Sequence, residues 1–377
     1  MKIAINCIFC QPRGGGVKEY IVNLTNEIAE VDDKNTYVLY VLEDQMDFAR
    51  QLLPTKYQIK SVPFKSDFLS VIKRSLFSQW FWYNEEKKEQ FDIFHSPFFY
   101  APRFRRAKLV VTVHDLRLYR FPKTYGKLRF LFLQHAVKET VRRADRIISI
   151  SNFTKNEIVD TCHVSPEKIV VIHEAVNRDS FSVDSIGKFQ LPSEYSYLST
   201  DRFLFSLGHI EPRKNYIRLI EAFTIIKQNP VFSDMKLVIA GKPNVDADKV
   251  IKLIEETPDV IYLNFVSREF LLWLYRNASL FVFPSFYEGF GFPPLEAASM
   301  GTVSVVSNIS SIPEVCGNSA FYFNPYNVSD IANSITQGLV DQQSLEAKKN
   351  LLEQQLQRFS WEKNAKETLK VYKNIVE

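Results

Sequence analysis

The chain has 377 residues, of which 46% are hydrophobic and 24% are charged, and its formal net charge is +4. This composition is typical of a globular protein with no nucleic-acid partner, and the length predicts two domains. No apolar run reaches the roughly 18–20 residues of a membrane-spanning helix, and the first residues lack the cleavage site of a signal peptide. Four scattered cysteines favour a reducing compartment, so we expect a cytoplasmic protein.

Apolar segments of strand length alternate with helical patterns through the first half of the chain. The expected strands are residues 2–9, 36–42, 57–62, 91–95, 108–114, 146–151 and 168–173. This alternation predicts a doubly wound α/β domain over residues 1–180. A glycine loop at residues 14–16 follows the first strand. Glu19, however, stands where the dinucleotide-binding fingerprint needs its third glycine, which argues against a dehydrogenase.

Two histidines in this half stand at the carboxyl ends of predicted strands. His114 comes directly after the apolar run 109–113. Open α/β sheets bind their ligands at these strand ends, so we predict a functional role for His114. His95 holds a similar position and is the weaker candidate. The alternative for both is a structural histidine that is satisfied inside the core.

Two stretches combine basic and aromatic residues. Residues 68–83 contain Lys73 and Arg74 among several aromatic side chains, and residues 99–146 contain 13 basic and 3 acidic residues. Helices of this kind bind anionic membrane surfaces through their charges and place their aromatic side chains among the lipids. The alternatives are a core helix for the first stretch and a solvated basic helix for the second. We expect both to contact the inner face of the cytoplasmic membrane.

Residues 181–201 lose this periodicity and are expected to form a linker. A second alternating pattern follows over residues 202–359, with strands at residues 202–208, 236–241, 260–267, 280–283 and 302–307. Arg213 and Lys214 stand just before its first helix, at the mouth of the second sheet. Two adjacent cations there suit a diphosphate. On their own they are more typical of a protein surface, but Glu288 and Glu296 in the same domain favour the diphosphate.

Residues 280–301 predict a strand, a glycine loop and a short helix. Gly289 and Gly291 allow the backbone to approach a ligand closely, and two prolines begin the helix. Glu288 stands at the mouth of the loop and Glu296 in the first helical turn. A helix N-terminus attracts anions, so the amides could hold phosphates while the two carboxylates hold hydroxyl groups. The alternative is an ordinary strand–helix unit with a structural turn.

Residues 288–296, Glu-Gly-Phe-Gly-Phe-Pro-Pro-Leu-Glu, resemble the E-x7-E signature of the retaining, nucleotide-sugar-dependent glycosyltransferases of family 4. Residues 208–215, Gly-His-Ile-Glu-Pro-Arg-Lys-Asn, are similar to the phosphate-binding turn of that family. The resemblance continues more weakly into the first half, at residues 14–16 and around His114. It implies an α/β fold of GT-B architecture: two Rossmann-like domains facing across a cleft, with a last helix, residues 360–377, crossing back to the first domain.

The resemblance also implies a role for individual residues. Arg213 and Lys214 would bind the donor diphosphate and stabilise its leaving charge, so that no metal or other cofactor is required. Glu288 would hold the transferred sugar, and His114 would contact that sugar from the first domain. Glu296 would hold the ribose, and residues 264–267 would lie by the base. The donor-binding residues implied in this way are Gly15, Gly16, Phe265, Gly289, Phe290, Gly291, Phe292, Leu295 and Glu296.

We therefore expect a retaining, metal-independent glycosyltransferase that uses a nucleotide diphosphate sugar. The local similarity favours the bacterial mannosyltransferases of O-antigen or capsule assembly. It implies GDP-mannose as donor and a glycan or a polyprenyl-diphosphate-linked oligosaccharide as acceptor. Two alternatives remain. One is a UDP-sugar-dependent GT-B enzyme with a soluble acceptor, either a glucosyl- or N-acetylglucosaminyltransferase or an epimerase. The other is a non-enzymatic two-lobe sugar-binding protein.

Overall fold

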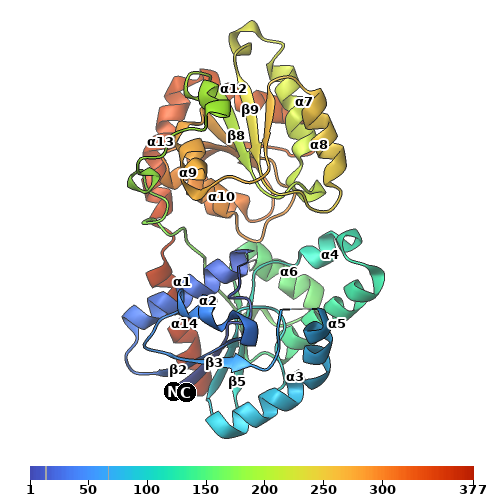
Figure 1. Cartoon of the computed structure of the whole chain (residues 1–377), viewed down its shortest axis with the longest axis vertical. Helices are drawn as coiled ribbons and strands as arrows, with labels where there is room; N and C mark the ends of the chain where they lie inside the picture. The colour runs from blue at the N-terminus through green and yellow to red at the C-terminus, as the bar shows by residue number, and fades with distance from the viewer. Residues whose placement is uncertain (13–14, 67) are drawn as a thin grey trace. The chain divides into compact units, whose positions relative to one another are not determined.

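The computed structural model describes residues 1–12, 15–66 and 68–377, apart from the side chains of residues 68–77 and 123. Gly14 of the glycine loop and the side chains of Lys73 and Arg74 therefore lie outside the described residues. The chain divides into two compact units (Figure 1). The first unit combines Met1–Glu174 with Ser360–Glu377, and the second is Ala175–Phe359.

A parallel sheet forms the centre of the first unit. Its seven described strands lie in the order β3-β2-β1-β4-β5-β6-β7. The strand order reverses between β1 and β4, and such a switch point is where doubly wound sheets bind ligands at the carboxyl ends of their strands. The strands are β1 (Lys2–Asn6), β2 (Thr36–Leu42), β3 (Gln58–Val62), β4 (Ile93–Ser96), β5 (Lys108–Val113), β6 (Arg146–Ser149) and β7 (Ile169–Val171).

Helices cover both faces of this sheet. One face packs against α3, α5 and α6, which contribute Trp82, Val141 and Ile158 to a shared apolar core. The other face carries α1 and α14, which also pack against each other. The helices described here are α1 (Gly15–Val31), α2 (Met46–Arg50), α3 (Phe68–Glu89), α4 (Arg117–Arg120), α5 (Lys127–Arg143), α6 (Asn152–Cys162) and α14 (Trp361–Val376).

The second unit, whose residues are all described, repeats this plan. Six parallel strands lie in the order β10-β9-β8-β11-β12-β13, so the switch point falls between β8 and β11. The strands are β8 (Phe203–Leu207), β9 (Lys236–Ala240), β10 (Val260–Leu263), β11 (Leu280–Phe283), β12 (Ser304–Ser307) and β13 (Ala320–Phe323). The helices are α7 (Tyr216–Ile226), α8 (Ala247–Glu256), α9 (Arg268–Asn277), α10 (Phe292–Ser299), α11 (Ile312–Cys316), α12 (Val328–Val340) and α13 (Gln342–Leu356).

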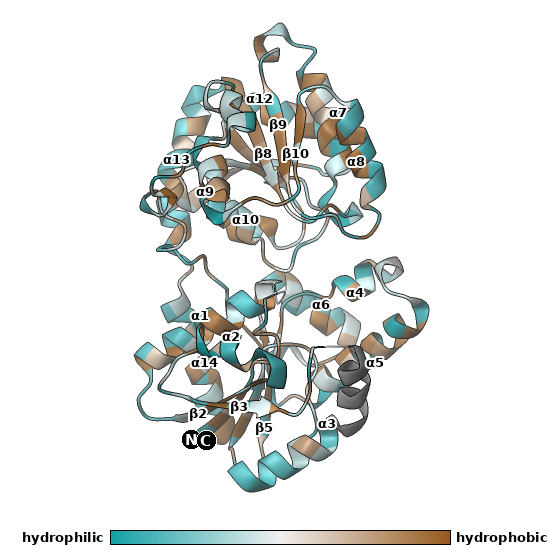
Figure 2. Cartoon of the chain, in the orientation of Figure 1, coloured by the Kyte–Doolittle hydropathy of each residue, from teal (hydrophilic) through white to brown (hydrophobic). Residues whose placement is uncertain are grey.

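The strands owe their form to continuous apolar runs. All four residues of β11 and five of the six residues of β5 are buried, as expected for parallel strands that are covered on both faces. In Figure 2 the strands β8, β9 and β10 are brown, whereas the helices beside them carry teal residues as well. This distribution places the core of each unit along its sheet, and the polar loops at the strand ends are left to form sites.

The boundary between the two units differs from the one predicted from the sequence. The first unit ends at Glu174, and residues 181–201, which we expected to be a linker, belong to the second unit. Phe189 stacks on Phe270 of α9 at 5.5 Å, and Phe181 and Leu191 pack on the same core. The apolar residues of this segment follow no helical or strand period, so its packing leaves no periodic signal in the sequence. The returning helix is α14, and Ser360 caps its start.

Candidate functional site

The candidate site of the second unit lies at the switch point between β8 and β11. The two strands pair in parallel, with Phe205 beside Phe281. The segments that follow β8 and β11 therefore leave the sheet at the same edge, although they are far apart in the sequence. The turn after β8 carries Arg213 and Lys214, and the loop after β11 carries Glu288. The structure brings these three predicted side chains into direct contact.

One carboxylate oxygen joins the two cations. Glu288 Oε1 lies 2.8 Å from Arg213 Nη1 and 2.7 Å from Lys214 Nζ. The three side chains are only 13%, 12% and 9% exposed, respectively, so water screens their charges weakly. Two neighbouring cations repel each other in such surroundings, and the shared carboxylate offsets this repulsion. The site therefore holds two positive charges close together, with an anion between them.

A second carboxylate, which is not among the predicted site residues, fixes Arg213. Glu211 Oε1 lies 2.9 Å from Arg213 Nε and 2.7 Å from Nη2. Its other oxygen, Oε2, accepts a hydrogen bond from Asn244 Nδ2 at 2.9 Å. Arg213 Nη1 also donates to the Tyr287 carbonyl at 2.7 Å. Glu211 lies in the quoted turn, two residues before Arg213, and this spacing was the signal available in the sequence.

Lys214 lies in a space that depends on glycine. Its Nζ stands 4.6 Å from the centre of the Phe283 ring, a cation–π contact. Gly208 has φ +149°, and a Cβ on it would come within 2.8 Å of Lys214 Cε. Asn215, in the left-handed conformation at φ 58°, donates its side-chain amide to the carbonyls of Pro284 and Pro325. The turn is thereby tied to the loop that carries Glu288.

The pKa shifts follow from this packing. Burial raises the pKa of Glu288, but the charges of Arg213 and Lys214 outweigh burial and lower it to about 2. Burial also lowers the pKa of Arg213, yet the Glu288 and Glu211 carboxylates raise it on balance. For Lys214, burial is the largest cause and its pKa is lowered, although Glu288 acts against it. Glu288 therefore remains ionised well below neutral pH.

The loop before α10 presents backbone to the site. Gly291 precedes the helix at φ +121°, and a Cβ there would meet nothing within 4 Å. Phe290 is buried, with its ring 5.5 Å from those of Phe292 and Phe359. Leu295 is also buried in the core. Because these side chains are used in packing, a ligand contact from Gly289, Phe290 or Leu295 would come from the backbone.

Two further predicted residues of the second unit, Glu296 and Phe265, stand on other elements than the loop before α10. Glu296, on α10, accepts a hydrogen bond from the Tyr275 hydroxyl at 2.7 Å through Oε2. Phe265 follows β10 and is 75% exposed, with Lys242 Nζ 4.8 Å from the centre of its ring. Lys242 follows β9, which pairs with β10. Phe265 is thus an open aromatic surface at the carboxyl edge of the second sheet.

In the first unit, His114 is held through both ring nitrogens. Nδ1 lies 3.0 Å from Glu174 Oε1, and Nε2 lies 3.0 Å from the Pro97 carbonyl oxygen. The Tyr20 ring meets the imidazole edge-on, with ring centres 4.9 Å apart. Gly15 and Gly16 begin α1 and are exposed, and a Cβ on either would meet nothing within 4 Å.

His95 is a structural histidine. It is fully buried, and its ring nitrogens lie 2.6 Å from the Tyr372 hydroxyl and 2.8 Å from Thr112 Oγ1. Burial lowers its pKa to about 3. A neutral imidazole that joins α14 to the sheet explains its position without a ligand, as the alternative reading of the sequence allowed.

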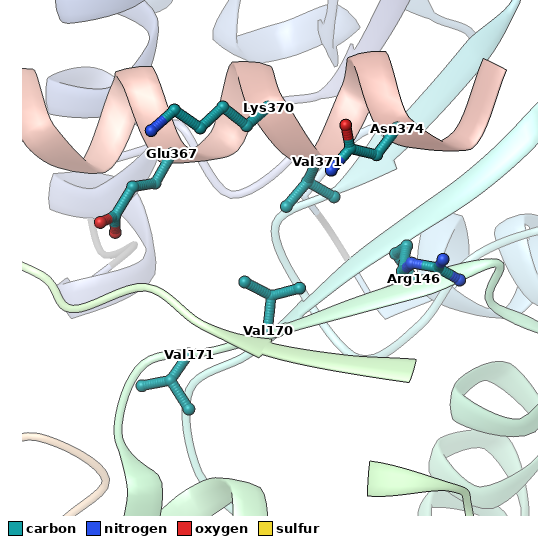
Figure 3. Close-up of a pocket in the computed structure, with 7 residues that line it drawn as sticks. All are labelled: Arg146, Val170, Val171, Glu367, Lys370, Val371 and Asn374. Atoms are coloured by element: carbon teal, nitrogen blue, oxygen red, sulfur yellow. The ribbon is translucent and has the colours of Figure 1, made fainter. Parts of the chain in front are cut away.

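The first unit also contains a hollow of about 310 Å³ between β7 and α14 (Figure 3). None of the predicted site residues lines it. Its lining comes from the first residue of β6, from the edge strand β7 and from α14. We do not assign it to the site. The lining residues are Arg146, Val170, Val171, Glu367, Lys370, Val371 and Asn374.

Comparisons with known proteins match both units. Residues 193–355 match the family model described as "Glycosyl transferases group 1", and residues 14–180 match "Glycosyltransferase Family 4". The O-antigen chain mannosyltransferase B of Escherichia coli is 32% identical over 74% of this chain and 74% of its own length. The chain belongs to the family 4, or group 1, glycosyltransferases. It is therefore an enzyme, and by its family and relatives a hexosyltransferase.

Further likenesses of this glycosyltransferase agree with that assignment. The serotype-specific mannosyltransferase WbdA of Escherichia coli is 32% identical over 59% of the chain, which corresponds to 28% of WbdA. A sucrose-phosphate synthase from Thermosynechococcus elongatus has the same fold, with a TM-score of 0.78, 16% identity and coverage of 100% of this chain and 99% of the synthase. The expected α/β fold of GT-B type, built from two Rossmann-like domains, is thus confirmed.

The basic region of the glycosyltransferase has an exposed apolar face. On α5, the side chains of Leu128, Leu131 and Phe132 are 84%, 51% and 55% exposed. Their spacing of three and four residues places them on one face of the helix. In the part of the chain that is described, no helix is long and apolar enough to cross a membrane.

Proposed function

We propose that this glycosyltransferase transfers mannose from GDP-mannose, with retention of configuration and without a metal, to a glycan or polyprenyl-diphosphate-linked acceptor in bacterial polysaccharide synthesis. The observation that carries the proposal is the pair of buried cations, Arg213 and Lys214, converging on Glu288 Oε1 at the switch point of the second sheet. The choice of mannose rests on the O-antigen mannosyltransferase of Escherichia coli described above.

The chemistry explains why cations belong there. As the bond between the anomeric carbon and the phosphate oxygen breaks, negative charge develops on the diphosphate. Arg213 and Lys214 would stabilise that charge, and they are already oriented before the reaction begins. Arginine binds two phosphate oxygens in a fork, whereas the lysine acts as a point charge. Other enzymes use a metal ion to compensate the negative charge of the departing diphosphate, whereas in this proposal two protein cations do so.

Retention follows if the acceptor attacks from the face that the phosphate leaves. The acceptor oxygen then forms a bond to the anomeric carbon while the carbon–phosphate oxygen bond breaks. The proton of the acceptor hydroxyl passes to the departing phosphate oxygen, so charges and atoms balance. Once the diphosphate occupies the cations, the Glu288 carboxylate is available for the hydroxyl groups of the transferred sugar. No pair of carboxylates flanking one bond is needed, unlike in glycosidases.

The same proposal includes a peripheral location on the cytoplasmic membrane face. Leu128, Leu131 and Phe132 are exposed on α5, and Lys127 and Arg129 stand beside them. Apolar side chains that project between cations suit the boundary between lipid head groups and acyl chains. This face would bring the enzyme to a lipid-linked acceptor.

A transfer assay tests the proposal. The purified enzyme is incubated with GDP-mannose, UDP-glucose or UDP-N-acetylglucosamine and a polyprenyl-diphosphate oligosaccharide, with and without EDTA. We expect transfer from GDP-mannose alone, undiminished by EDTA, and an α-linked product by NMR because the donor is α-linked. Transfer from a UDP-sugar alone would keep the enzyme class and reject mannose. Loss of activity in EDTA, or a β-linked product, would reject the metal-free retaining mechanism.

A further inference from the structure

His114 and Glu174 form a buried pair whose chemistry goes beyond the contact expected of His114. Glu174 lies just after β7 and is 1% exposed. Its Oε1 stands 3.0 Å from His114 Nδ1. A carboxylate removed from water is strongly disfavoured unless it is hydrogen-bonded and paired with a positive charge. Within the described residues, His114 supplies the hydrogen bond to this carboxylate.

The second ring nitrogen of His114 also faces an acceptor. Nε2 lies 3.0 Å from the Pro97 carbonyl oxygen, which can accept a hydrogen bond but cannot donate one. A neutral imidazole carries one N–H group and can satisfy only one of two acceptors, whereas the imidazolium satisfies both. The contacts on the two sides of the ring therefore favour its doubly protonated form.

The orientation of the ring is fixed as well. Tyr20 meets the imidazole at an interplanar angle of 84°, and the Tyr20 hydroxyl lies 3.1 Å from Thr112 Oγ1. The His114 side chain keeps 15% of its surface exposed, compared with 2% for Glu174. Solvent can thus reach the histidine of the pair, whereas the glutamate is buried.

We propose that Glu174 is the positioning residue of His114: it keeps the ring charged and aims Nε2–H at the substrate. In the structure the Pro97 carbonyl accepts this hydrogen bond, and a hydroxyl of the substrate takes its place during transfer. Glu174 itself does not touch the substrate. This inference rests on the proposed function, because it takes His114 to contact a substrate of the sugar transfer.

Of the other titratable groups around the ring, Asp115 acts in the same sense as Glu174, and His95 and Tyr20 are neutral. Burial lowers the pKa of His114, but the hydrogen bond and charge of Glu174, together with the Pro97 carbonyl and Asp115, outweigh it and raise the pKa on balance. His95 on β4 has its pKa lowered to about 3 by burial and is neutral. Burial raises the pKa of Tyr20 on α1, so this side chain is neutral too.

Glu174→Gln tests the inference because it keeps the shape and an oxygen for Nδ1–H but removes the charge. Glu157→Gln is the matched control, since Glu157 is also buried in the first unit and pairs with Arg120 at 2.7 Å. The imidazole nitrogens of ¹⁵N-labelled, ligand-free protein are titrated by NMR. We expect His114 to titrate above the ordinary histidine value of about 6.5 in the wild type and in Glu157→Gln. In Glu174→Gln we expect it to lose its proton at least about tenfold more easily, a fall of one pH unit.

The pH profile of transfer links the pair to function. Because the wild-type ring keeps its proton to higher pH, the alkaline limb of kcat should move to lower pH in Glu174→Gln, with little change in KM for the donor. A wild-type His114 that titrates at or below the ordinary value would overturn the inference, even if Glu174→Gln fails to fold. Identical pH profiles in the wild type and Glu174→Gln would overturn it too. If the wild type transfers no sugar at all, the proposed function fails, while the imidazole titration still decides about the pair.

Discussion

Glu211 binds the guanidinium of Arg213 through one carboxylate oxygen, Oε1, which lies 2.9 Å from Nε and 2.7 Å from Nη2. The remaining nitrogen, Nη1, is left to Glu288 and to the Tyr287 carbonyl. A guanidinium engaged at all three nitrogens has one orientation. Charges oriented before the reaction are those that stabilise a transition state most effectively. Glu211 is therefore a positioning residue for the candidate donor site.

Removal of Glu211 should destabilise the second unit. Glu211→Ala leaves Arg213 buried with one carboxylate instead of two, and breaking a buried ion pair costs on the order of 3 kcal/mol. Urea unfolding measures this cost. The control is Glu353→Ala, which removes an exposed partner of Arg178 and should cost less than about 1 kcal/mol. Equal costs for the two variants would mean that Glu211 does not hold Arg213 as described.

Gly208→Ala should lower the rate of transfer as well as the stability, because an alanine at φ +149° is strained. The new Cβ would stand 2.8 Å from Lys214 Cε, so the lysine must move and its Nζ must leave its place 4.6 Å from the centre of the Phe283 ring. Displacing one charge-stabilising group costs about 10²-fold in kcat. Gly187→Ala is the control, because Gly187 also has a positive φ, +59°, but nothing lies within 4 Å of its Cβ. A near-normal kcat in Gly208→Ala, measured by steady-state transfer, would show that the position of Lys214 is unimportant.

The pH dependence of stability should reveal the ion pair of Glu288. Its pKa is lowered from 4.5 to about 2, so its contribution is fully present above about 4.5 and is lost as the pH falls towards 2. Such a shift corresponds to about 3 kcal/mol. Urea unfolding of the wild type and Glu288→Gln at several pH values should therefore give a difference that shrinks below about pH 4.5. Glu346→Gln, which removes an exposed partner of Lys349, is the control and should change the stability by less than about 1 kcal/mol. A difference for Glu288→Gln that does not change with pH contradicts the pairing.

The apolar face of α5 should govern binding to anionic vesicles. The double variant Leu128→Glu with Phe132→Glu removes exposed apolar surface and adds negative charge, so we expect it to sediment with phosphatidylglycerol vesicles at least tenfold less than the wild type. Val231→Glu, at an exposed position of the second unit, is the control and should bind normally. If the double variant binds the vesicles as well as the wild type does, α5 is a solvated basic helix that does not contact the membrane.

Two arginines of the basic stretch 99–146 are engaged within the protein. Arg143 binds Glu139 and the carbonyls of Pro102 and Ala101. Arg142 donates to the Cys162 carbonyl at 3.1 Å. Both arginines fasten the end of α5 to neighbouring segments. Their replacement would test folding rather than membrane binding, which is why the exposed apolar residues are the better probe.

Much of the fold was predictable because buried parallel strands leave continuous apolar runs, as at residues 109–113 and 280–283. The grouping of Arg213, Lys214 and Glu288 was also predictable, since each stands just after a strand and strand ends share one edge of a sheet. The contact between Glu211 and Asn244 was not, because it joins residues brought together only by the pairing of β8 with β9.

Other features depend on tertiary contacts that no local sequence pattern indicates. Glu174 follows β7 without any motif, and its partner His114 follows β5, two strands away in the sheet. His95 and His114 occupy equivalent places in the sequence, at the ends of neighbouring strands. Only the structure separates them, because His95 meets Tyr372 of α14, whereas His114 meets a carboxylate and keeps part of its surface open.

The most direct test of the central claim is calorimetric titration of GDP, and separately UDP, into the wild type and Lys214→Met in the presence of EDTA. Methionine keeps an unbranched side chain of similar length but removes the charge. We predict that GDP binds the wild type without metal, that Lys214→Met binds it at least tenfold more weakly, and that UDP binds poorly to both. Tight binding of GDP by Lys214→Met, or no binding of either nucleotide by the wild type, would contradict the assignment of these cations to the donor diphosphate.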